Sequence, residues 1–302
     1  MVVRKRKLGN TGLEVSEVGY GALEIGRDWA ADCNPDPSHP TEAEAGRVLN
    51  AVLDRGINFI DTAPAYWNSE EFIGKAIAHR RSEYILATKV GEHCDRSGSF
   101  YDYSAKATLE FIDRSLKRLQ TEYIDLLQIH SASIEVLERG ETFGAMQEAQ
   151  RAGKVRHLGM TGGIAECERA VELGGYETVQ FPYNLLNRSA ENRLFGLARE
   201  KNVGCIIMRG LAGGKLTSKY SNLQDQKLVE VIRELDRIAA PELLAAVAVR
   251  FVMARPEVSS AIFGTRRIEA VDENLSAAEK KLDSGVAARI ASVLRTCPIT
   301  AW

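Results

Sequence analysis

The sequence predicts an α/β fold, a closed (β/α)8 TIM barrel with an N-terminal β-hairpin and extra C-terminal helices. Eight short apolar segments recur along 302 residues, and nearly all are separated by amphipathic helical segments. No linker rich in proline or serine divides the chain, so we expect one barrel domain spanning residues 1–302. An open doubly wound sheet is the structural alternative, but no G-x-G-x-x-G sequence follows an early strand.

The first part of the chain predicts a hairpin and then the first strand of the barrel. Residues 4–18 read as two short strands around the turn sequence Asn10-Thr11-Gly12. A strand is expected at residues 19–22, followed by a long loop through Pro40 that has no helical or strand period. The sequence Thr41-Glu42-Ala43-Glu44 is a capping box, so a helix is expected to begin there.

The remaining chain repeats the alternation of strand and helix. Apolar residues at helical spacing predict a helix after most strands, two helices near 224–238 and 241–254, and further helices to the end of the chain. Residues 91–103 are expected to form a second long polar loop. Strands are expected near residues 57–60, 84–89, 124–129, 155–160, 178–181, 203–208 and 259–263.

Composition excludes several classes of protein. Hydrophobic residues make up 45% of the chain and charged residues 26%, with a net charge of −2, so the chain lacks the basic bias of a nucleic-acid binder. No apolar run is long enough to span a membrane, and the start M-V-V-R-K-R-K lacks the apolar segment of a secretory signal. We therefore expect a soluble cytoplasmic protein whose partner is a small molecule.

The cysteines and histidines do not indicate a metal site or a disulfide framework. The five cysteines are widely spaced and form no C-x-x-C pair, which favours reduced thiols. The five histidines are also scattered, without H-x-x-x-H or H-E-x-x-H spacing. The sequence therefore predicts no bound metal.

Ionisable side chains follow three consecutive predicted strands. Asp61 ends the first of these strands, Tyr66 lies in the turn after it, and Lys89 and His130 end the next two. In a barrel the carboxyl ends of the strands converge on one mouth, where the chemistry of such folds is located. Each residue alone fits a packing or solvated position, but their coincidence at consecutive strand ends indicates a catalytic cluster.

Several longer motifs surround these residues. They are G-I-N-F-I-D-T-A-x-x-Y at 56–66, A-T-K at 87–89, Y-I-D-L-L-Q-I-H at 123–130, G-K-V-R-H-L-G at 153–159, Q-F-P-Y-N at 180–184 and F-G-T-R-R at 263–267. With these motifs the sequence resembles the aldo-keto reductase family, from the Asn10-Thr11-Gly12 turn to Leu275. The resemblance implies a barrel that binds NADPH in extended form without a Rossmann motif, and a catalytic tetrad at Asp61, Tyr66, Lys89 and His130.

The chemistry of carbonyl reduction suits these side chains. Hydride transfer requires a proton for the developing alkoxide, and a phenol is a poor donor unless its neighbours tune it. An ammonium close to the phenol is expected to lower the pKa of Tyr66, and Asp61 keeps Lys89 charged and oriented. His130 would donate a hydrogen bond to the carbonyl oxygen and so orient it.

The resemblance also implies positions for the cofactor. Thr161 and Gln180 would contact the nicotinamide carboxamide, and Arg266 would contact the 2′-phosphate, which favours NADPH over NADH. Two departures from the family are Met208, where many relatives have an aromatic residue, and Ala270, where relatives often have Arg or Gln. The full set of predicted cofactor residues is Gly21, Ala22, Asp61, Thr161, Gln180, Met208, Arg209, Gly210, Leu211, Gly213, Lys215, Gly264, Thr265, Arg266, Glu273 and Asn274.

The sequence thus predicts an NADP(H)-dependent oxidoreductase that reduces an aldehyde or ketone to an alcohol, with Tyr66 as proton donor. The alternative is a regulatory or redox-sensing protein that binds NADPH, contacts a partner and turns over slowly. Substrate contacts are expected from Trp29, Trp67 and Tyr101, which lie in segments near the predicted mouth. Trp67 replaces the glycine that commonly follows the catalytic tyrosine in the family.

Overall fold

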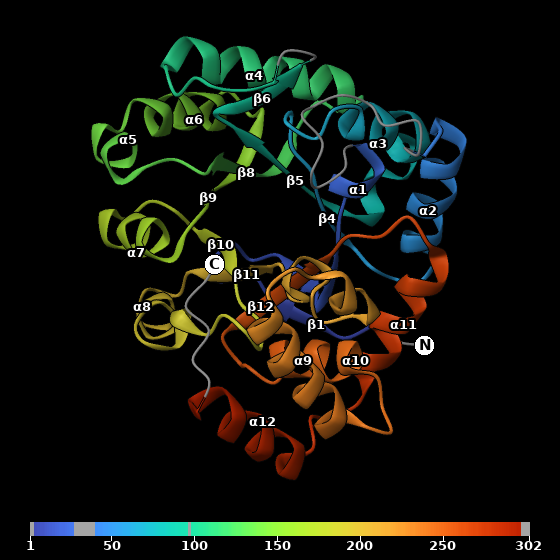
Figure 1. Ribbon diagram of the computed structural model, residues 1–302. Coiled ribbons are helices and arrows are strands. Elements are labelled where there is room, and N and C mark those ends of the chain that lie inside the picture. The colour runs from blue at the N-terminus through green and yellow to red at the C-terminus, as the bar shows by residue number, and fades with distance from the viewer. Residues whose placement is uncertain (1–2, 27–39, 96–97, 297–302) are drawn as a thin grey trace.

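The structure is a computed structural model that describes residues 3–26, 40–95 and 98–296. Eight parallel strands close into a barrel in chain order, which confirms the predicted fold. Figure 1 shows the strands at the centre and the helices arranged around them. The barrel strands are β3 (Val18–Gly21), β4 (Phe59–Asp61), β5 (Ile85–Val90), β8 (Ile124–His130), β9 (Val155–Thr161), β10 (Thr178–Pro182), β11 (Gly204–Met208) and β12 (Val258–Phe263).

The register of the parallel strands brings the predicted polar residues to one end of the barrel. Each strand is a nearly continuous buried run, as expected for strands covered on both faces. Cα partners near the carboxyl ends are Gly21 with Asp61, Asp61 with Ala87, Lys89 with Gln128, and His130 with Thr161. The polar residues at the last position of β4 and β8, and at the last but one of β5, therefore face the same mouth.

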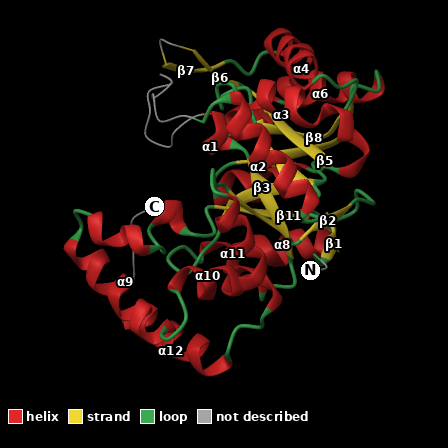
Figure 2. Ribbon diagram, turned by 90° about the vertical axis from the view of Figure 1, so that its right-hand side faces the viewer, coloured by secondary structure: helices red, strands yellow, loops and turns green. Residues whose placement is uncertain are grey.

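Two antiparallel hairpins lie at opposite ends of the barrel, as Figure 2 shows. The predicted N-terminal hairpin consists of β1 (Lys5–Lys7) and β2 (Glu14–Ser16). A second hairpin of β6 (Glu92–Asp95) and β7 (Gly98–Tyr101) lies at the mouth. The expectation of an irregular loop at residues 91–103 was therefore wrong, because polar residues in this segment pair through their backbones.

The α-helices surround the barrel, and the predicted capping box at Thr41 and Glu44 is present. The short helix α5 was not expected, because its six residues are too few to show a helical period and Gly140 ends it in a left-handed conformation. The helices are α1 (Leu23–Gly26), α2 (Glu42–Asp54), α3 (Ser69–Ile77), α4 (Ala105–Leu119), α5 (Ile134–Arg139), α6 (Glu141–Arg151), α7 (Ile164–Leu173), α8 (Leu194–Lys201), α9 (Gln226–Ala239), α10 (Leu244–Met253), α11 (Ile268–Glu279) and α12 (Ser284–Thr296).

Short 3-10 helices connect some of these elements. They are η1 (Ala78–Glu83), η2 (Ser189–Glu191), η3 (Ala212–Gly214) and η4 (Ser218–Asn222). Two of them, η2 and η3, follow β10 and β11 and so contribute to the loops at the mouth.

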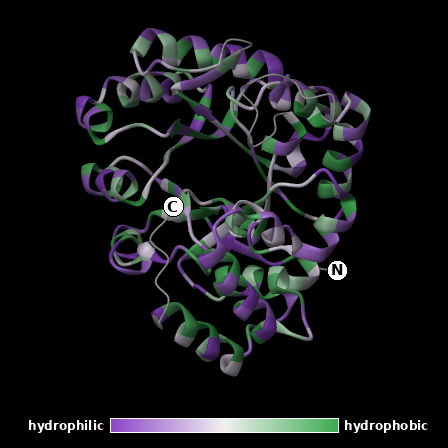
Figure 3. Ribbon diagram, viewed as in Figure 1, coloured by the Kyte–Doolittle hydropathy of each residue, from purple (hydrophilic) through white to green (hydrophobic). Residues whose placement is uncertain are grey.

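The core has three parts. The main cluster packs the outer face of the barrel strands against the surrounding helices, whose surfaces alternate between hydrophobic and hydrophilic residues in Figure 3. A small cluster that includes Leu8, Val15 and Phe59 packs the N-terminal hairpin against the interior of the barrel. A third cluster joins α9, α10 and α12 through residues such as Ile232, Val247 and Ile290. The extra helices thus have their own apolar packing.

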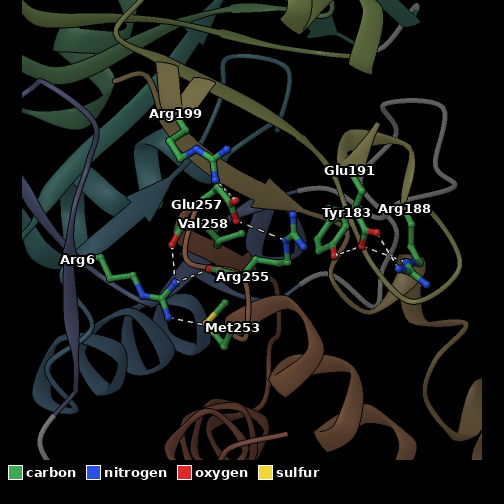
Figure 4. Close-up of polar contacts among 9 residues, drawn as sticks. All are labelled: Arg6, Tyr183, Arg188, Glu191, Arg199, Met253, Arg255, Glu257 and Val258. Carbon is green, nitrogen blue, oxygen red and sulfur yellow. Dashed lines mark hydrogen bonds and ion pairs between the residues drawn. The ribbon is translucent and has the colours of Figure 1, made fainter. Parts of the chain in front are cut away.

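Arg6 attaches the N-terminal hairpin to the segment before and at the start of β12. Its guanidinium donates hydrogen bonds to the backbone oxygens of Met253 at 2.9 Å, Arg255 at 2.8 Å and Val258 at 2.7 Å. Figure 4 shows these contacts. Since Glu17 also pairs with Arg6 at 2.6 Å, the arginine charge is compensated. These bonds hold the hairpin at the end of the barrel opposite the mouth.

Among the described cysteines, Cys94 differs from the expectation of reduced thiols. Cys167 and Cys205 are free and buried, as packing residues are. Cys94 of β6 is disulfide-bonded, so the expectation of reduced thiols throughout was wrong at this residue. The described helices include none with the length and apolarity needed to cross a membrane.

Candidate active site

A buried ion pair lies at the ends of β4 and β5. The Nζ atom of Lys89 lies 2.7 Å from Oδ2 of Asp61, and both side chains are 1% exposed. Lys89 also donates to the backbone oxygen of Thr62 at 2.8 Å. Because a buried charge is costly unless it is paired and hydrogen-bonded, these contacts are what allow a lysine to end a barrel strand.

Gln128 provides a further hydrogen bond to Asp61. Its Nε2 atom donates to Oδ1 of Asp61 at 3.1 Å, so each carboxylate oxygen of Asp61 has a donor. The sequence reasoning quoted Gln128 within a motif but gave it no role. The signal was available: Gln128 precedes His130 by two residues on the same strand, and alternate strand residues share a face.

Tyr66 lies in the turn between β4 and α3, next to this pair. Lys89 hydrogen-bonds the Tyr66 side chain, and its Nζ atom lies 4.8 Å from the centre of the phenol ring. Gly26 of α1 permits this turn to come close, because a Cβ atom at Gly26 would lie 1.9 Å from the backbone oxygen of Tyr66. Gly26 was also missed, since this contact joins segments far apart in the sequence.

For Tyr66 and for Lys89 alike, burial and the main neighbouring charge shift the pKa in opposite directions. Burial raises the pKa of the Tyr66 phenol, and the Lys89 charge acts in the lowering direction without overcoming it. The expectation of a lowered pKa at Tyr66 was therefore wrong, because desolvation of the phenolate outweighs its attraction to the ammonium. Burial alone would lower the pKa of Lys89, but the charge of Asp61 and the hydrogen bonds raise it, so the amine stays charged.

His130 ends β8 on the other side of Tyr66. The two rings meet edge to face, with their centroids 6.0 Å apart. The Nδ1 atom of His130 lies 3.1 Å from Oε2 of Glu92, the first residue of β6. Glu92 was not predicted, because it lies in the segment that was interpreted as a loop. Asp61, Tyr66, Lys89 and His130 are thus brought together at the mouth.

A cavity of about 840 Å³ lies beside this cluster, over the ends of β8 to β11. Ser131, which follows His130, is part of its wall. Arg209 also lines the cavity, and its charge interacts with Tyr66. The cavity is lined by Ser131, Ala132, Ser133, Gly162, Gly163, Ile164, Glu166, Pro182, Leu186, Asn187, Arg188, Ser189, Met208 and Arg209.

The wall of the cavity is supported by a partly buried polar network. The ring of Tyr183, in the Q-F-P-Y-N motif, packs against Phe195 and Phe251, and its hydroxyl donates to Glu191 at 2.6 Å. Arg188 donates to the same carboxylate at 2.7 and 3.0 Å (Figure 4). This arrangement fixes the loop after β10, so Tyr183 has a structural contact and not one at the site.

The predicted nicotinamide residues lie at or near the carboxyl ends of β9, β10 and β11. Thr161 is 2% exposed and Gln180 is 1% exposed, and Met208 lines the cavity. The Oε1 atom of Gln180 is buried and has no hydrogen-bond partner among the described residues. An unpaired buried amide oxygen at this position fits a carboxamide donor, so these residues suit a nicotinamide.

The loop after β11 takes conformations that bring its backbone close to its neighbours. Gly213 and Gly214 have φ of 64° and 87°, which favours glycine. A Cβ atom at Gly210 would lie 2.9 Å from the ring of Phe263. The predicted residues Arg209, Gly210, Leu211, Gly213 and Lys215 therefore form one tight turn at the mouth.

The predicted phosphate residues lie after β12, at the start of α11. Arg266 donates to the backbone oxygen of Glu24 at 2.9 Å, which places it beside α1. A Cβ atom at Gly264 would lie 3.1 Å from the backbone oxygen of Gly21, so Gly21 and Ala22 border the same turn. No side chain caps the N-terminus of α11. On the second turn of this helix Glu273 pairs with Arg267 at 3.6 Å, and Asn274 follows.

The predicted substrate residues have different outcomes. Trp29 lies outside the described residues. Trp67 is partly buried and has a left-handed backbone, with φ of 52°. Tyr101 of β7 is 57% exposed and stacks on Tyr103. Substrate contact by Trp67 or Tyr101 stays a prediction.

Comparison with known proteins agrees with this geometry. Residues 17–295 match the Aldo/keto reductase family. The aldo-keto reductase YhdN of Bacillus subtilis is 31% identical over 88% of this chain and 87% of its own. L-galactose dehydrogenase of Arabidopsis thaliana is 31% identical over 91% of this chain and 88% of its own.

A solved structure shows the same similarity over the whole barrel. The holo form of aldo-keto reductase AKR11C1 from Bacillus halodurans has a TM-score of 0.84 and 28% identity, covering 100% of this chain and 98% of that one. Together, the closed barrel, the polar cluster at its mouth and these matches show that the chain belongs to the aldo/keto reductase family, oxidoreductases that reduce carbonyls with a nicotinamide cofactor.

Proposed function

We propose that this protein is an NADPH-dependent reductase of small aldehydes or ketones in which Tyr66 donates the proton. The observation that carries the proposal is the meeting of Tyr66 with the buried Lys89–Asp61 pair beside a cavity at the barrel mouth. A phenol in contact with an ammonium can give up a proton, because the resulting phenolate is stabilised by the positive charge.

The residues divide the chemistry among them. A bound nicotinamide cofactor would supply hydride to the carbonyl carbon. The Tyr66 O–H bond breaks as its proton passes to the carbonyl oxygen, and Lys89 stabilises the phenolate that remains. His130 donates a hydrogen bond to the same oxygen and orients the carbonyl. Asp61, held by Gln128, keeps Lys89 charged and in place.

The preference for NADPH is proposed from the start of α11. Arg266 and Arg267 lie beside a helix N-terminus without a side-chain cap, where backbone N–H groups and the helix dipole favour a phosphate. An arginine fork suits the phosphate oxygens, and NADH has no phosphate at this position. Thr161 and Gln180 would hold the carboxamide at the other end of the cofactor.

Substitution of Tyr66 by Phe tests the proton-donor role. We expect the rate of NADPH oxidation with a generic aldehyde to fall by about 10²–10⁴-fold, while the Kd for NADPH is unchanged. Tyr176→Phe is the matched control, since Tyr176 is buried and its hydroxyl has no partner among the described residues. A Tyr66→Phe protein with the wild-type rate would contradict the role.

The same assay separates the enzyme from a regulatory protein. A wild-type protein that binds NADPH tightly but oxidises none of it in single-turnover experiments with a panel of aldehydes would favour the regulatory function instead.

A further inference from the structure

The β6–β7 hairpin places a carboxylate against the histidine of the site. Oε2 of Glu92 lies 3.1 Å from Nδ1 of His130, and the two side chains are 9% and 12% exposed. The other carboxylate oxygen accepts a hydrogen bond from Ser99 Oγ at 2.9 Å, across the hairpin. The carboxylate is therefore held from both sides and largely shielded from water.

A second contact attaches the hairpin to the same histidine. The Tyr103 hydroxyl donates to the backbone oxygen of His130 at 2.8 Å. Its ring lies over Gly91, which has φ of 99° and where a Cβ atom would lie 2.3 Å from the ring. Since Gly91 and Tyr103 flank the hairpin on either side, both ends of the segment are fixed against the end of β8. The position of Glu92 is thus built into the fold.

The position of the carboxylate decides which hydrogen bonds His130 can make. A neutral imidazole has one N–H, and the nitrogen that carries it is set by the partner of the other nitrogen. The contact between Glu92 and Nδ1 is at ion-pair distance and is not a hydrogen bond of good geometry. The carboxylate charge still favours a proton on Nδ1 over a lone pair facing it, which leaves Nε2 of the neutral ring as an acceptor only. An imidazolium donates from both nitrogens, and a neighbouring carboxylate favours this charged form. His130 can therefore donate to a carbonyl oxygen from Nε2 only when it is charged.

The other ionisable groups that the described residues place near His130 have contacts of their own. Lys89 is paired with Asp61, and the Tyr66 ring meets His130 edge to face. The Arg209 charge acts on Tyr66. His93, the next residue of β6, stacks its ring on Phe100 of β7 and lies near Phe111 of α4. Within the part of the chain that the structure describes, Glu92 lies at ion-pair distance from His130.

We propose that Glu92 is a positioning residue that keeps His130 as an imidazolium, so that carbonyl reduction requires a charged histidine at the mouth. The inference rests on the proposed function, because it deepens the role given there to His130. The proton on Nε2 stays on the ring as a hydrogen bond to the carbonyl oxygen, and the transferred proton still comes from Tyr66.

Glu92→Gln tests this role, because the amide has the size of the carboxylate but carries no charge. We expect the alkaline limb of the pH profile of kcat/KM for reduction to move to lower pH. On the alkaline side the rate should fall by about 10²-fold relative to wild type, the usual effect of losing one donor to the developing oxyanion. On the acid side, where the ring is protonated in both proteins, the rates should converge.

NMR titration measures the charge of the His130 ring without any catalysis. The ring signals are assigned by comparison with a His130→Gln protein. We expect wild-type His130 to stay charged above neutral pH and to lose its proton at lower pH in Glu92→Gln. This readout keeps the inference separate from the proposed function: an inactive wild-type protein would end the reductase proposal and leave the titration to decide the pairing.

Two further variants control the experiment. Glu92→Asp keeps the charge and should keep the wild-type pH profile at a reduced rate. Glu110→Gln makes the same charge change on the outer face of α4, where the side chain is 69% exposed, and should match wild type. An unchanged His130 titration in Glu92→Gln, or an equal loss of rate at every pH, would overturn the proposal. If Glu92→Gln does not fold, an uncharged His130 at neutral pH in wild type would overturn it.

Discussion

Lys89 and Asp61 form an ion pair whose Nζ and Oδ2 atoms are 2.7 Å apart and whose side chains are both 1% exposed. Such a pair is stable only while both members are present, because removing one leaves the other charged in a medium of low dielectric. The pair is therefore both a structural element of the barrel and the group that acts on Tyr66.

Lys89→Met should lower both stability and activity. Asp61 would keep Gln128 as a donor but lose its counter-charge, and we expect the free energy of unfolding to fall by about 3–5 kcal/mol. Denaturant unfolding measures this loss, and NADPH oxidation measures the loss of turnover. Lys106→Met is the control, because Lys106 is 86% exposed and its partner Glu110 is 3.9 Å away. Equal effects of the two substitutions would contradict the assignment.

Gly26→Ala should displace the turn that carries Tyr66. The added Cβ atom would lie 1.9 Å from the backbone oxygen of Tyr66 and 2.6 Å from the backbone nitrogen of Ser69, so the turn must move. A displacement of about 1 Å can cost about 10²-fold in rate, and we expect kcat to fall accordingly while the Kd for NADPH changes little.

Gly46→Ala provides the comparison for this substitution. Gly46 lies within α2, and a Cβ atom there would meet Ala76 at 3.5 Å, an ordinary contact. Alanine at an unstrained helix position should stabilise the protein and leave kcat unchanged. Wild-type kcat in Gly26→Ala would show that the turn tolerates movement.

The polar cluster at the mouth could be predicted largely from the sequence, because strand register links sequence position to place in the barrel. Asp61, Lys89 and His130 each follow a buried apolar run, and parallel strands carry such residues to one mouth. Gln128 could have been added by the period of two along β8. The eight barrel strands were predictable for the same reason, since each is a short apolar run bounded by polar segments.

Other parts of the site depend on contacts that local patterns do not encode. Glu92 reaches His130 because a polar segment forms a hairpin, and no hydrophobic alternation indicates that register. The requirement for glycine at Gly26 comes from a backbone approach between α1 and the Tyr66 turn. The direction of the pKa change at Tyr66 depends on how far burial exceeds the effect of Lys89, which is a property of the folded surroundings.

Arg266→Ala should weaken NADPH and leave NADH unaffected. Arg266 lies beside α1 at the uncapped N-terminus of α11, where we propose that the 2′-phosphate binds. Loss of a charge-assisted contact worth about 1.5–3 kcal/mol should raise the Kd for NADPH by roughly 10- to 100-fold. Fluorescence titration with both cofactors measures the effect, with NADH as the internal control. An equal rise in the Kd for NADH would show that Arg266 does not contact the 2′-phosphate of NADPH.

Glu242 should contribute to the pH dependence of stability. Arg250 donates to its two carboxylate oxygens at 2.7 and 2.6 Å, which lowers the pKa of Glu242 from 4.5 to about 2. The native protein therefore binds fewer protons here than the unfolded chain, and the stabilisation present above pH 4.5 is lost as the pH falls through about 2.

Glu242→Gln should flatten the change of Tm over this acid range and lower Tm at neutral pH. Thermal unfolding followed across the range measures both effects. Glu110→Gln, which removes a carboxylate that is 69% exposed, should keep the wild-type curve. A wild-type slope in Glu242→Gln would mean that the Arg250 pair contributes nothing in solution.

Trp67→Gly should separate a backbone effect from a substrate effect. Trp67 follows Tyr66 with φ of 52°, a conformation that costs an L-residue about 1–2 kcal/mol, whereas glycine adopts it freely. Glycine also loses about 0.5–1 kcal/mol through the entropy of the unfolded chain, so we expect Tm to change little.

If the indole lines the substrate site, KM for bulky apolar aldehydes should rise while KM for small ones stays constant. Asn202→Gly makes a comparable backbone change at φ of 53°, at the end of α8, and should leave every KM unchanged. If the KM of Trp67→Gly equals that of wild type for every aldehyde in the panel, Trp67 serves packing alone.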